Sequence, residues 1–442
     1  MKKLSILLVT ALLFLSLTGC CQRGGVETGS TVRLLNFKPE IASVYESIAK
    51  AYENETGVRL IVETAAANTY ESTLTAKMAT NEAPTIFQIN GPRGYANWKD
   101  YCKNLEDSRI ADIVTDEDLL LSTDEGVFGI PYVVEGYGII YNDAIMRKFF
   151  ALPDKKTQIS SAQEITSFDS LKEVVEEMTQ RKADLGIEGV FASTSLKPGE
   201  DWRWQTHLMN IPVHYEFSKN DINLETDEVA NFNFEFAENY KKLFDLYLNN
   251  SVTDKKMLGA KITGDSMAEF ALGKCAMVQN GNWGYSQIKE VGGNTVSAED
   301  VKMMPIYMGI DDEDQGLCIG TEGYLSINKR ADEAAQQAAE DFLYWLFSSE
   351  TGKKYVTEGL GFITPFNTFS NDETPDDPLA REVVRWMNME GVDTIPWDFV
   401  IFPSQVFKNN LGSNLLQYAQ GTKDWSTVRD ETVKDWKAES NR

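Results

Sequence analysis

The chain has 442 residues, of which 42% are hydrophobic, so it can bury the cores of two or three domains. Its 67 acidic residues outnumber its 42 basic residues, and the formal net charge is -25 at pH 7. Because phosphate binding requires clustered Lys and Arg, this balance argues against nucleic acid as a partner.

The first twenty residues have the pattern of a secretory signal. Lys2 and Lys3 precede an apolar run from Leu4 to Leu17, and Thr18-Gly19-Cys20 follows. The run is too short to span a bilayer comfortably, and no later segment is long and apolar enough to do so. The ending resembles the bacterial lipobox, in which the cysteine is lipidated and becomes the new N-terminus. We therefore expect residues 1–19 to be a lipoprotein signal peptide.

This prediction places the protein outside the cytoplasm, anchored by lipid at Cys20 to the outer face of the bacterial cell membrane. The alternative is an ordinary signal peptide with a chance cysteine at its end. Residues 20–31 are polar and rich in glycine, which predicts a flexible tether. Loss of residues 1–19 would remove Lys2 and Lys3 and leave a net charge near -27.

Strand-like and helical patterns alternate after the tether. Apolar stretches at 32–35, 58–62 and 85–89 predict strands, and the helical spacing from Ile41 to Tyr52 predicts a helix that Gly57 ends. A strand, a helix and a second strand within about thirty residues indicate a βαβ unit, and therefore a parallel sheet in an α/β domain.

The rest of the chain adds further elements of both kinds. Extended segments are predicted at 138–142 and around residues 303–305, and helices are predicted over 70–80, 168–178, 234–248 and 340–356. Cys102, Cys275 and Cys318 are scattered, with no C-x-x-C motif, which favours three buried free thiols; a single disulfide among them is the alternative.

Several segments together resemble the extracellular solute-binding proteins of carbohydrate ABC importers, the group that includes maltose-binding protein. The segments that carry the resemblance, in the order of the family, are residues 49–58 (AKAYENETGV), 129–132 (GIPY) with 138–142 (GIIYN), 270–277 (FALGKCAM) with 280–283 (NGNW), 320–328 (GTEGYLSIN) and 345–350 (WLFSSE). Each motif is weak alone, but their joint order over residues 31–365 is specific. The segment 366–442 resembles nothing that we can place.

The resemblance implies an α/β fold of two hinge-connected lobes with a ligand cleft between them. We expect the N-terminal lobe to contain residues 32–132 and 305–330, and the C-terminal lobe to contain 133–304 and 331–442. The chain departs from well-known members at Glu135-Gly136-Tyr137 in the first crossing and in the acidic loop 311–314.

A sugar site needs flat aromatic rings for the apolar face of the sugar and fixed polar groups for its hydroxyls. Trp283 matches the stacking position of the family, and Asn282 beside it could bond hydroxyls; a core tryptophan and a turn asparagine are the alternatives. Trp202, Arg203 and Trp204 are the second candidate, since both rings would share a face in an extended segment. Interlobe packing is the alternative there, and Trp397 is a third aromatic candidate.

Polar candidates follow the strands of the first lobe and its return segment, where loops would face the cleft. They are Asn36, Lys38, Asn68, Tyr70, Asn90, Glu135 and Glu322. For each of them, a solvated loop position is the alternative reading.

No catalytic constellation is recognisable. Only His207 and His214 are available as histidines, and hydrolase, zinc-protease and phosphate-loop motifs are missing from the sequence. A cell-surface glycosidase needs only two carboxylates and stays the enzymatic alternative. Residues 311–322 partly match a calcium-loop template, but a strand-like segment follows them, so we interpret them as an acidic surface loop.

The sequence therefore predicts a substrate-binding lipoprotein that captures a sugar or oligosaccharide outside the membrane and delivers it to an ABC permease. We expect a monomer without catalytic residues, cofactor or metal. A binding protein for a polyamine or a peptide is the alternative, with Glu135 and Glu322 as partial acidic walls.

Overall fold

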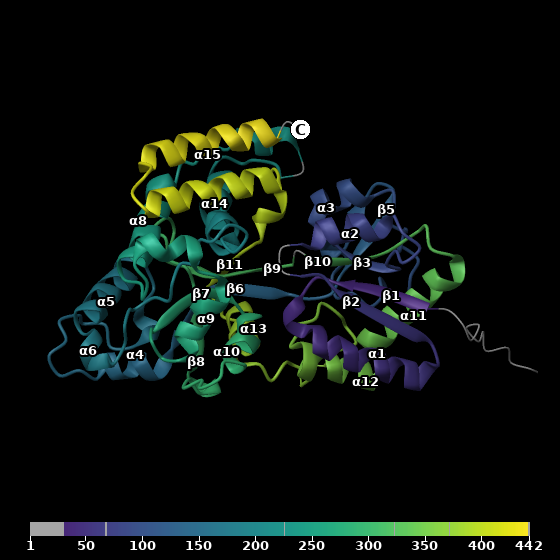
Figure 1. Ribbon diagram of the computed structural model, residues 1–442, viewed down its shortest axis with the longest axis horizontal. Coiled ribbons are helices and arrows are strands. Elements are labelled where there is room, and N and C mark those ends of the chain that lie inside the picture. The colour runs from purple at the N-terminus through teal and green to yellow at the C-terminus, as the bar shows by residue number, and fades with distance from the viewer. Residues whose placement is uncertain (1–30, 67–68, 225, 322, 371, 441–442) are drawn as a thin grey trace, which may run out of the picture.

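The computed structural model describes residues 31–66, 69–224, 226–321, 323–370 and 372–440, which form two α/β lobes (Figure 1). The predicted lipobox, Cys20 and most of the tether lie outside the described residues. The two-lobe α/β architecture that the resemblance implied is confirmed. Within the described residues, no helix is long and apolar enough to cross a membrane.

The first lobe is built on a six-stranded sheet. Its strands, in spatial order, are β2 (Arg59–Thr64), β1 (Thr31–Asn36), β3 (Ile86–Asn90), β10 (Gly323–Ile327), β5 (Gly126–Pro131) and β4 (Leu121–Thr123). β1 pairs in parallel with β2 and with β3, which confirms the predicted βαβ start. The helix between β1 and β2, α1 (Ala42–Thr56), ends at Gly57, whose φ of 75° favours glycine.

The second lobe is built on a smaller sheet in which β6 (Glu135–Asn142) is central. Around it lie β11 (Asp393–Ile395), β9 (Gln315–Gly320), β7 (Met277–Gly281) and β8 (Val301–Met304). Every residue of β6 is buried, as expected for a strand covered on both faces. β9 runs through the segment that partly matched a calcium loop, so residues 315–320 are a strand there.

Helices cover both sheets. Those of the first lobe are α1, α2 (Tyr70–Met78), α3 (Gly91–Trp98), α11 (Glu333–Ser348) and α12 (Glu350–Lys354). Those of the second lobe are α4 (Asp143–Phe150), α5 (Phe168–Gln180), α6 (Lys182–Leu185), α7 (Met209–Lys219), α8 (Ala237–Asn249), α9 (Thr263–Ala271), α10 (Gly284–Lys289), α13 (Pro378–Met387), α14 (Gln405–Ala419) and α15 (Trp425–Ser440). In Figure 1, α14 and α15 lie side by side along one edge of the second lobe.

The helix predicted over 340–356 is two helices in the structure. α11 ends at Ser348, and Ser349 takes an extended conformation in which its hydroxyl accepts a hydrogen bond from the N–H of Gly352. Ser349 thus caps the start of α12, which continues into the π-helical turn η8 (Tyr355–Leu360). The apolar periodicity continues through the break, which is why the sequence alone predicted one helix.

The lobe boundaries differ from the predicted division in two places. β9 pairs with β6 and so belongs to the second sheet, although we had assigned 305–330 to the first lobe. Conversely, Phe342, Leu346 and Phe366 pack in the first lobe's core, although we had assigned 331–442 to the second. The apolar face of a helix shows that it is covered, but periodicity does not say which sheet covers it.

The chain therefore passes between the lobes three times: between β5 and β6, between β9 and β10, and between Phe366 and α13. Cys102, Cys275 and Cys318 are free and buried, which confirms the prediction for the thiols. The C-terminal segment that the sequence could not place supplies Trp425 and Trp436 to the second lobe's main core.

Candidate functional site

An aromatic cluster lies where the second lobe meets the first. It consists of Trp202, His207, Trp283 and Trp397, and we call it the aromatic cluster below. Its ring centroids are 6.1 Å apart for Trp202 and Trp283, 6.3 Å for Trp283 and Trp397, and 5.4 Å for His207 and Trp283. The three tryptophans come from segments almost 200 residues apart, so only the fold brings them together.

His207 lies at the centre of this cluster. Its ring stacks on Tyr137 of β6 with centroids 4.3 Å apart, and the Tyr137 hydroxyl donates a 3.0 Å hydrogen bond to the His207 carbonyl. Burial lowers the pKa of His207 well below its ordinary value, with smaller effects from the positive charges of Arg203, Lys408 and Lys38. The imidazole is therefore neutral at pH 7 and can exchange hydrogen bonds without carrying charge.

Two glycines make room for the indole rings. A Cβ atom added to Gly281 would lie 2.1 Å from the ring of Trp283, and one added to Gly320 would lie 2.7 Å from the ring of Trp397. Each ring thus packs closely against backbone at the carboxyl end of a strand, β7 or β9. Ligands of α/β proteins tend to bind at these strand ends.

A buried ion pair joins the lobes beside the cluster. Lys38 follows β1 in the first lobe, and its Nζ lies 2.8 Å from a carboxylate oxygen of Glu135 at the start of β6. Their side chains are only 11% and 7% exposed. The same Nζ lies 5.7 Å from the centre of the Trp283 ring, a cation–π arrangement across the lobes. Glu135 is thus neutralised by Lys38.

Asparagines fix the backbone on both sides of this pair. The Asn282 side chain accepts a 2.9 Å hydrogen bond from the N–H of Gly136, which ties the Trp283 loop to the crossing strand. In the first lobe, the Asn36 side chain accepts from the N–H of Lys38 and donates to the Lys38 carbonyl. Both amides are buried and hold the polar rim in place.

The segment that carries Trp397 is clamped by α7. Asn210 donates to the carbonyl of Pro396 at 2.9 Å and accepts from the N–H of Phe399 at 2.7 Å. One turn later, His214 Nδ1 lies 2.8 Å from the carboxylate of Asp398. These contacts fix the short helix η9 (Asp398–Ile401), which also touches α3 of the first lobe.

Trp202 and Trp204 do not share a face, so that prediction was wrong. The segment is helical rather than extended: Arg203–Leu208 form the π-helical turn η4, and Trp202 has helical dihedral angles. Residues two apart on a helix point in different directions. Trp202 therefore joins the aromatic cluster, whereas Trp204 is 3% exposed and packs on Phe244 and Tyr247 in the core.

Other predicted site residues lie apart from the cluster. Tyr70 is buried in the first lobe, where its hydroxyl accepts from the N–H of Gln88 and its ring packs edge-on against Phe37. Asn90 stands at the carboxyl end of β3 and accepts from the side chain of Gln88. Asn68 and Glu322 lie outside the described residues. Arg203 is fully buried behind Trp202.

Sequence reasoning did not assign His207, Tyr137 and Asn210 to this site. His207 was considered only as a catalytic histidine, and its helical spacing from Arg203 became visible only once the segment was known to be helical. Tyr137 was noted only as a departure from the family in the first crossing, and it lies in a strand that is buried on both faces. Asn210 acts through backbone contacts with a segment almost 190 residues away, and no local signal reveals it.

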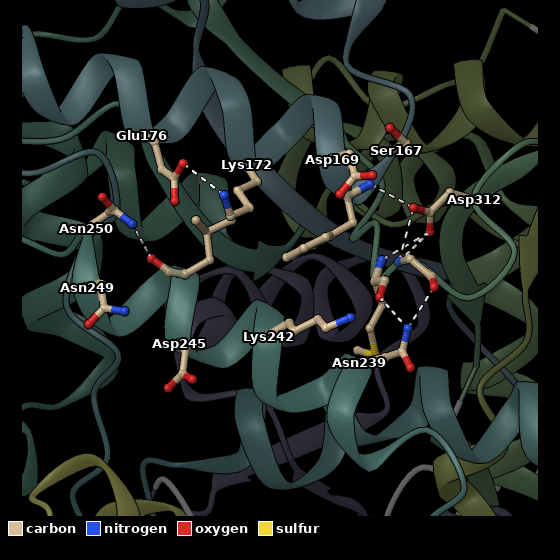
Figure 2. Close-up of a pocket in the computed structure, with 14 residues that line it drawn as sticks. Ser167, Asp169, Lys172, Glu176, Asn239, Lys242, Asp245, Asn249, Asn250 and Asp312 are labelled. Atoms are coloured by element: carbon tan, nitrogen blue, oxygen red, sulfur yellow. Dashed lines mark hydrogen bonds and ion pairs between the residues drawn. The ribbon is translucent and has the colours of Figure 1, made fainter.

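A separate groove of about 690 Å³ lies on the second lobe between α5, α8 and residues 308–312 (Figure 2). Several of its polar groups already have partners. Lys172 pairs with Glu176, Asn239 donates to the carbonyls of Met308 and Gly309, and Asp312 accepts from backbone N–H groups. The groove has no stacked aromatic rings, so we place the candidate site at the aromatic cluster instead.

Among the described residues, no group of three or more His, Cys, Asp or Glu side chains could hold a metal ion. The cluster therefore offers rings, amides and one neutral imidazole rather than a metal centre. Such a set can stack on and hydrogen-bond a polar ring compound.

Comparison with known proteins identifies relatives of this architecture. Residues 47–382 match the family model of the bacterial extracellular solute-binding proteins, which is well over half of the chain. Among curated proteins, none matches.

Solved structures share the fold at low identity. A chitin oligosaccharide binding protein has a TM-score of 0.68 at 16% identity, covering 93% of this chain and 99% of its own. The GacH receptor of Streptomyces glaucescens, studied with acarbose, has a TM-score of 0.67 at 14% identity over 93% and 98%. A Bacillus licheniformis sugar transporter in complex with stachyose has a TM-score of 0.64 at 15% identity over 92% and 99%.

Proposed function

This chain belongs to the family of bacterial extracellular solute-binding proteins, and we propose that it captures a sugar or oligosaccharide and delivers it to an ABC permease. The observation that carries the proposal is the aromatic cluster at the lobe junction, with Trp202, Trp283 and Trp397 around His207. Flat rings held by backbone glycines are suited to the apolar faces of sugar rings. The fold relatives named above include proteins solved with acarbose and with stachyose.

In this proposal Trp283 and Trp202 stack on the ligand, and Trp397 closes the third side of the site. Asn282, Asn36, Lys38 and Glu135 hold the polar rim. The protein performs no chemistry: it binds ligand outside the cytoplasm, the lobes close, and the permease receives the closed form. Lipid at Cys20 keeps a monomer at the membrane surface.

The structure weakens the case for a polyamine. A polycation would need unpaired carboxylates, yet Glu135 is already paired with Lys38 at 2.8 Å. The second predicted acidic wall, Glu322, lies outside the described residues. A neutral polyol ligand needs no such charge, so it fits the described rim better than putrescine or spermidine does.

The test is thermal unfolding of the purified protein with mono- and oligosaccharides, putrescine and spermidine. A ligand at a hundred times its dissociation constant adds about 2.7 kcal/mol to the free energy of unfolding. Chromatography of the glycan afterwards must show it intact, because shortening would indicate a glycosidase. Stabilisation by polyamines alone would refute a sugar ligand.

A matched pair of variants tests the location of the site. Trp283→Ala should abolish most of the stabilisation by sugar. Trp345→Ala removes an equally half-buried indole of the first lobe, packed on Tyr52 and Phe342, and should leave the affinity unchanged. Equal losses of affinity in the two variants would place the site elsewhere.

A further inference from the structure

Arg203 is a buried cation that forms no ion pair among the described residues. The residue is 1% exposed, its guanidinium donates to the hydroxyl of Ser195, and its Nε has no partner. The acid whose charge it senses, Glu200, forms no ion pair with it and instead accepts from the N–H of Thr263 at 3.1 Å. Burial lowers the pKa of Arg203 to about 10, so it still carries its charge at pH 7.

This cation lies directly behind the proposed site. Its guanidinium carbon is 5.4 Å from the centre of the Trp202 ring, and that ring belongs to the aromatic cluster. Phe191 bridges in parallel to Met277 of β7, so the segment that leads to Ser195 runs alongside β7. Ser195 and Gly281 therefore lie towards the same carboxyl edge, where ligands of this fold class tend to bind.

Three other ionisable groups beside the cluster add no net charge to it. Lys38 and Glu135 neutralise each other at 2.8 Å, and His207 is uncharged at pH 7 because of its burial. Arg203 and Lys408 act on His207 of the cluster with positive charge, and the Arg203 guanidinium carbon is the one that lies 5.4 Å from the centre of the Trp202 ring. A buried charge without an ion-pair partner is costly to a protein, which makes Arg203 unexpected in a purely structural role.

We propose that the ligand is an acidic glycan, one whose sugar carries a carboxylate or sulfate group that the charge of Arg203 attracts. This inference rests on the proposed sugar-binding function and specifies its substrate class. A sugar stacked on the partly exposed ring of Trp202 would bring its substituents to within a Debye length of the guanidinium. At about 8 Å between the guanidinium and the acidic group, and with an effective dielectric constant near 20, the attraction should raise the affinity for the anionic sugar over its neutral form by roughly tenfold or more.

The overall charge of the protein makes this local cation more informative. A net charge of -25 repels anions at long range, but salt at about 0.15 M screens that field beyond roughly 8 Å. Binding must therefore be compared at physiological ionic strength, where the local charge dominates.

The experiment uses isothermal titration of the full chain with matched glycans at 150 mM salt. The probes are an oligosaccharide that contains a uronic acid, the same compound with its carboxyl reduced to an alcohol, and a sulfated analogue of the reduced compound. We expect the reduced compound to bind at least tenfold more weakly than one of the two anionic compounds. Which anionic compound binds better identifies the acidic group.

The Arg203→Met variant should lose this preference and bind the acidic and reduced compounds equally. Arg203→Lys, which keeps the charge, should retain most of it. If neither variant folds, the comparison of glycans on the unmodified protein still tests the inference. Equal or tighter binding of the reduced glycan would refute the acidic ligand and leave sugar binding intact. No binding of any glycan would refute the proposed function itself.

Discussion

The buried pair of Lys38 and Glu135 yields the most direct test of how the lobes are held beside the site. Glu135→Gln keeps the size of the side chain and removes its charge. Lys38 would then keep a positive charge in a place where its side chain is only 11% exposed. Removal of one partner of a fully buried pair costs about 3–5 kcal/mol.

A second acid near Lys38, Glu40, reduces the loss of stability that we expect. Glu40 lies close enough to Lys38 that the two charges interact, and burial raises the pKa of Glu40 above its usual value, with Lys38 partly opposing the effect. An ionised Glu40 offsets part of the lysine charge. We expect the free energy of unfolding to fall by about 2 kcal/mol in Glu135→Gln, below the range for a pair without such a neighbour.

The assay is urea unfolding followed by tryptophan fluorescence, with a double-mutant cycle. Lys38→Met combined with Glu135→Gln removes both charges and should recover most of the loss, because no unpaired charge remains. The control is Glu63→Gln, since Glu63 pairs with Lys77 at 2.6 Å but is 38% exposed. Exposed pairs contribute about 0–1 kcal/mol, so this variant should change little.

Two results would refute this reasoning. A loss below about 0.5 kcal/mol in Glu135→Gln would mean that the pair is solvated and contributes no more than an exposed one. A double variant as unstable as the single one would mean that the glutamate acts through packing rather than through its charge.

Three further predictions follow from other contacts. Asn210→Ala removes two buried hydrogen bonds that hold the Trp397 segment. It should lower the free energy of unfolding by about 2–4 kcal/mol and weaken sugar binding. An unchanged affinity in a titration would show that these two bonds have only a structural role. Burial raises the pKa of Asp201 to about 6, above its unfolded value, so the native protein loses stability as pH rises from about 4 to 6. Asp201→Asn should therefore gain stability relative to the native chain across that range in urea titrations, and a difference independent of pH would contradict the assignment. Gly91 has a φ of 58°, and a Cβ added to it would lie 3.2 Å from Val400 of the other lobe. Gly91→Ala should therefore lower the free energy of unfolding by about 1–2 kcal/mol, as measured by thermal unfolding. An unchanged stability would show that the neighbouring side chain moves without cost.

The sequence predicted those parts of the fold that depend on local patterns. Gly57 ended α1 as expected, and the apolar stretches became β1, β2 and β3 within one or two residues. Local periodicity cannot identify the partner of an element, however. For that reason α11 was assigned to the wrong lobe, although its existence was predicted correctly.

The candidate site shows the same division. Trp283 and Trp397 were found because an indole in a loop is a local signal, and both lie in the aromatic cluster. Trp204 was misplaced because the segment is helical and not extended. In a helix, a side chain two residues away points in a different direction, whereas in a strand it points to the same face. The pairing of Lys38 with Glu135 joins residues 97 positions apart, and no local pattern encodes it.

The three passages of the chain between the lobes have a consequence for biosynthesis. The first lobe needs β10, α11 and Phe366, so it stays incomplete until the part of the second lobe from β6 to β9 has been synthesised. At roughly 5–20 residues per second, the N-terminal strands wait about 15–60 seconds for the residues that cover them. During that interval β3 exposes the edge that Ser326 of β10 later occupies. Neither lobe can be expressed alone by truncating the chain at a single position. A chaperone that shields the exposed edge of β3 would determine the yield of folded protein.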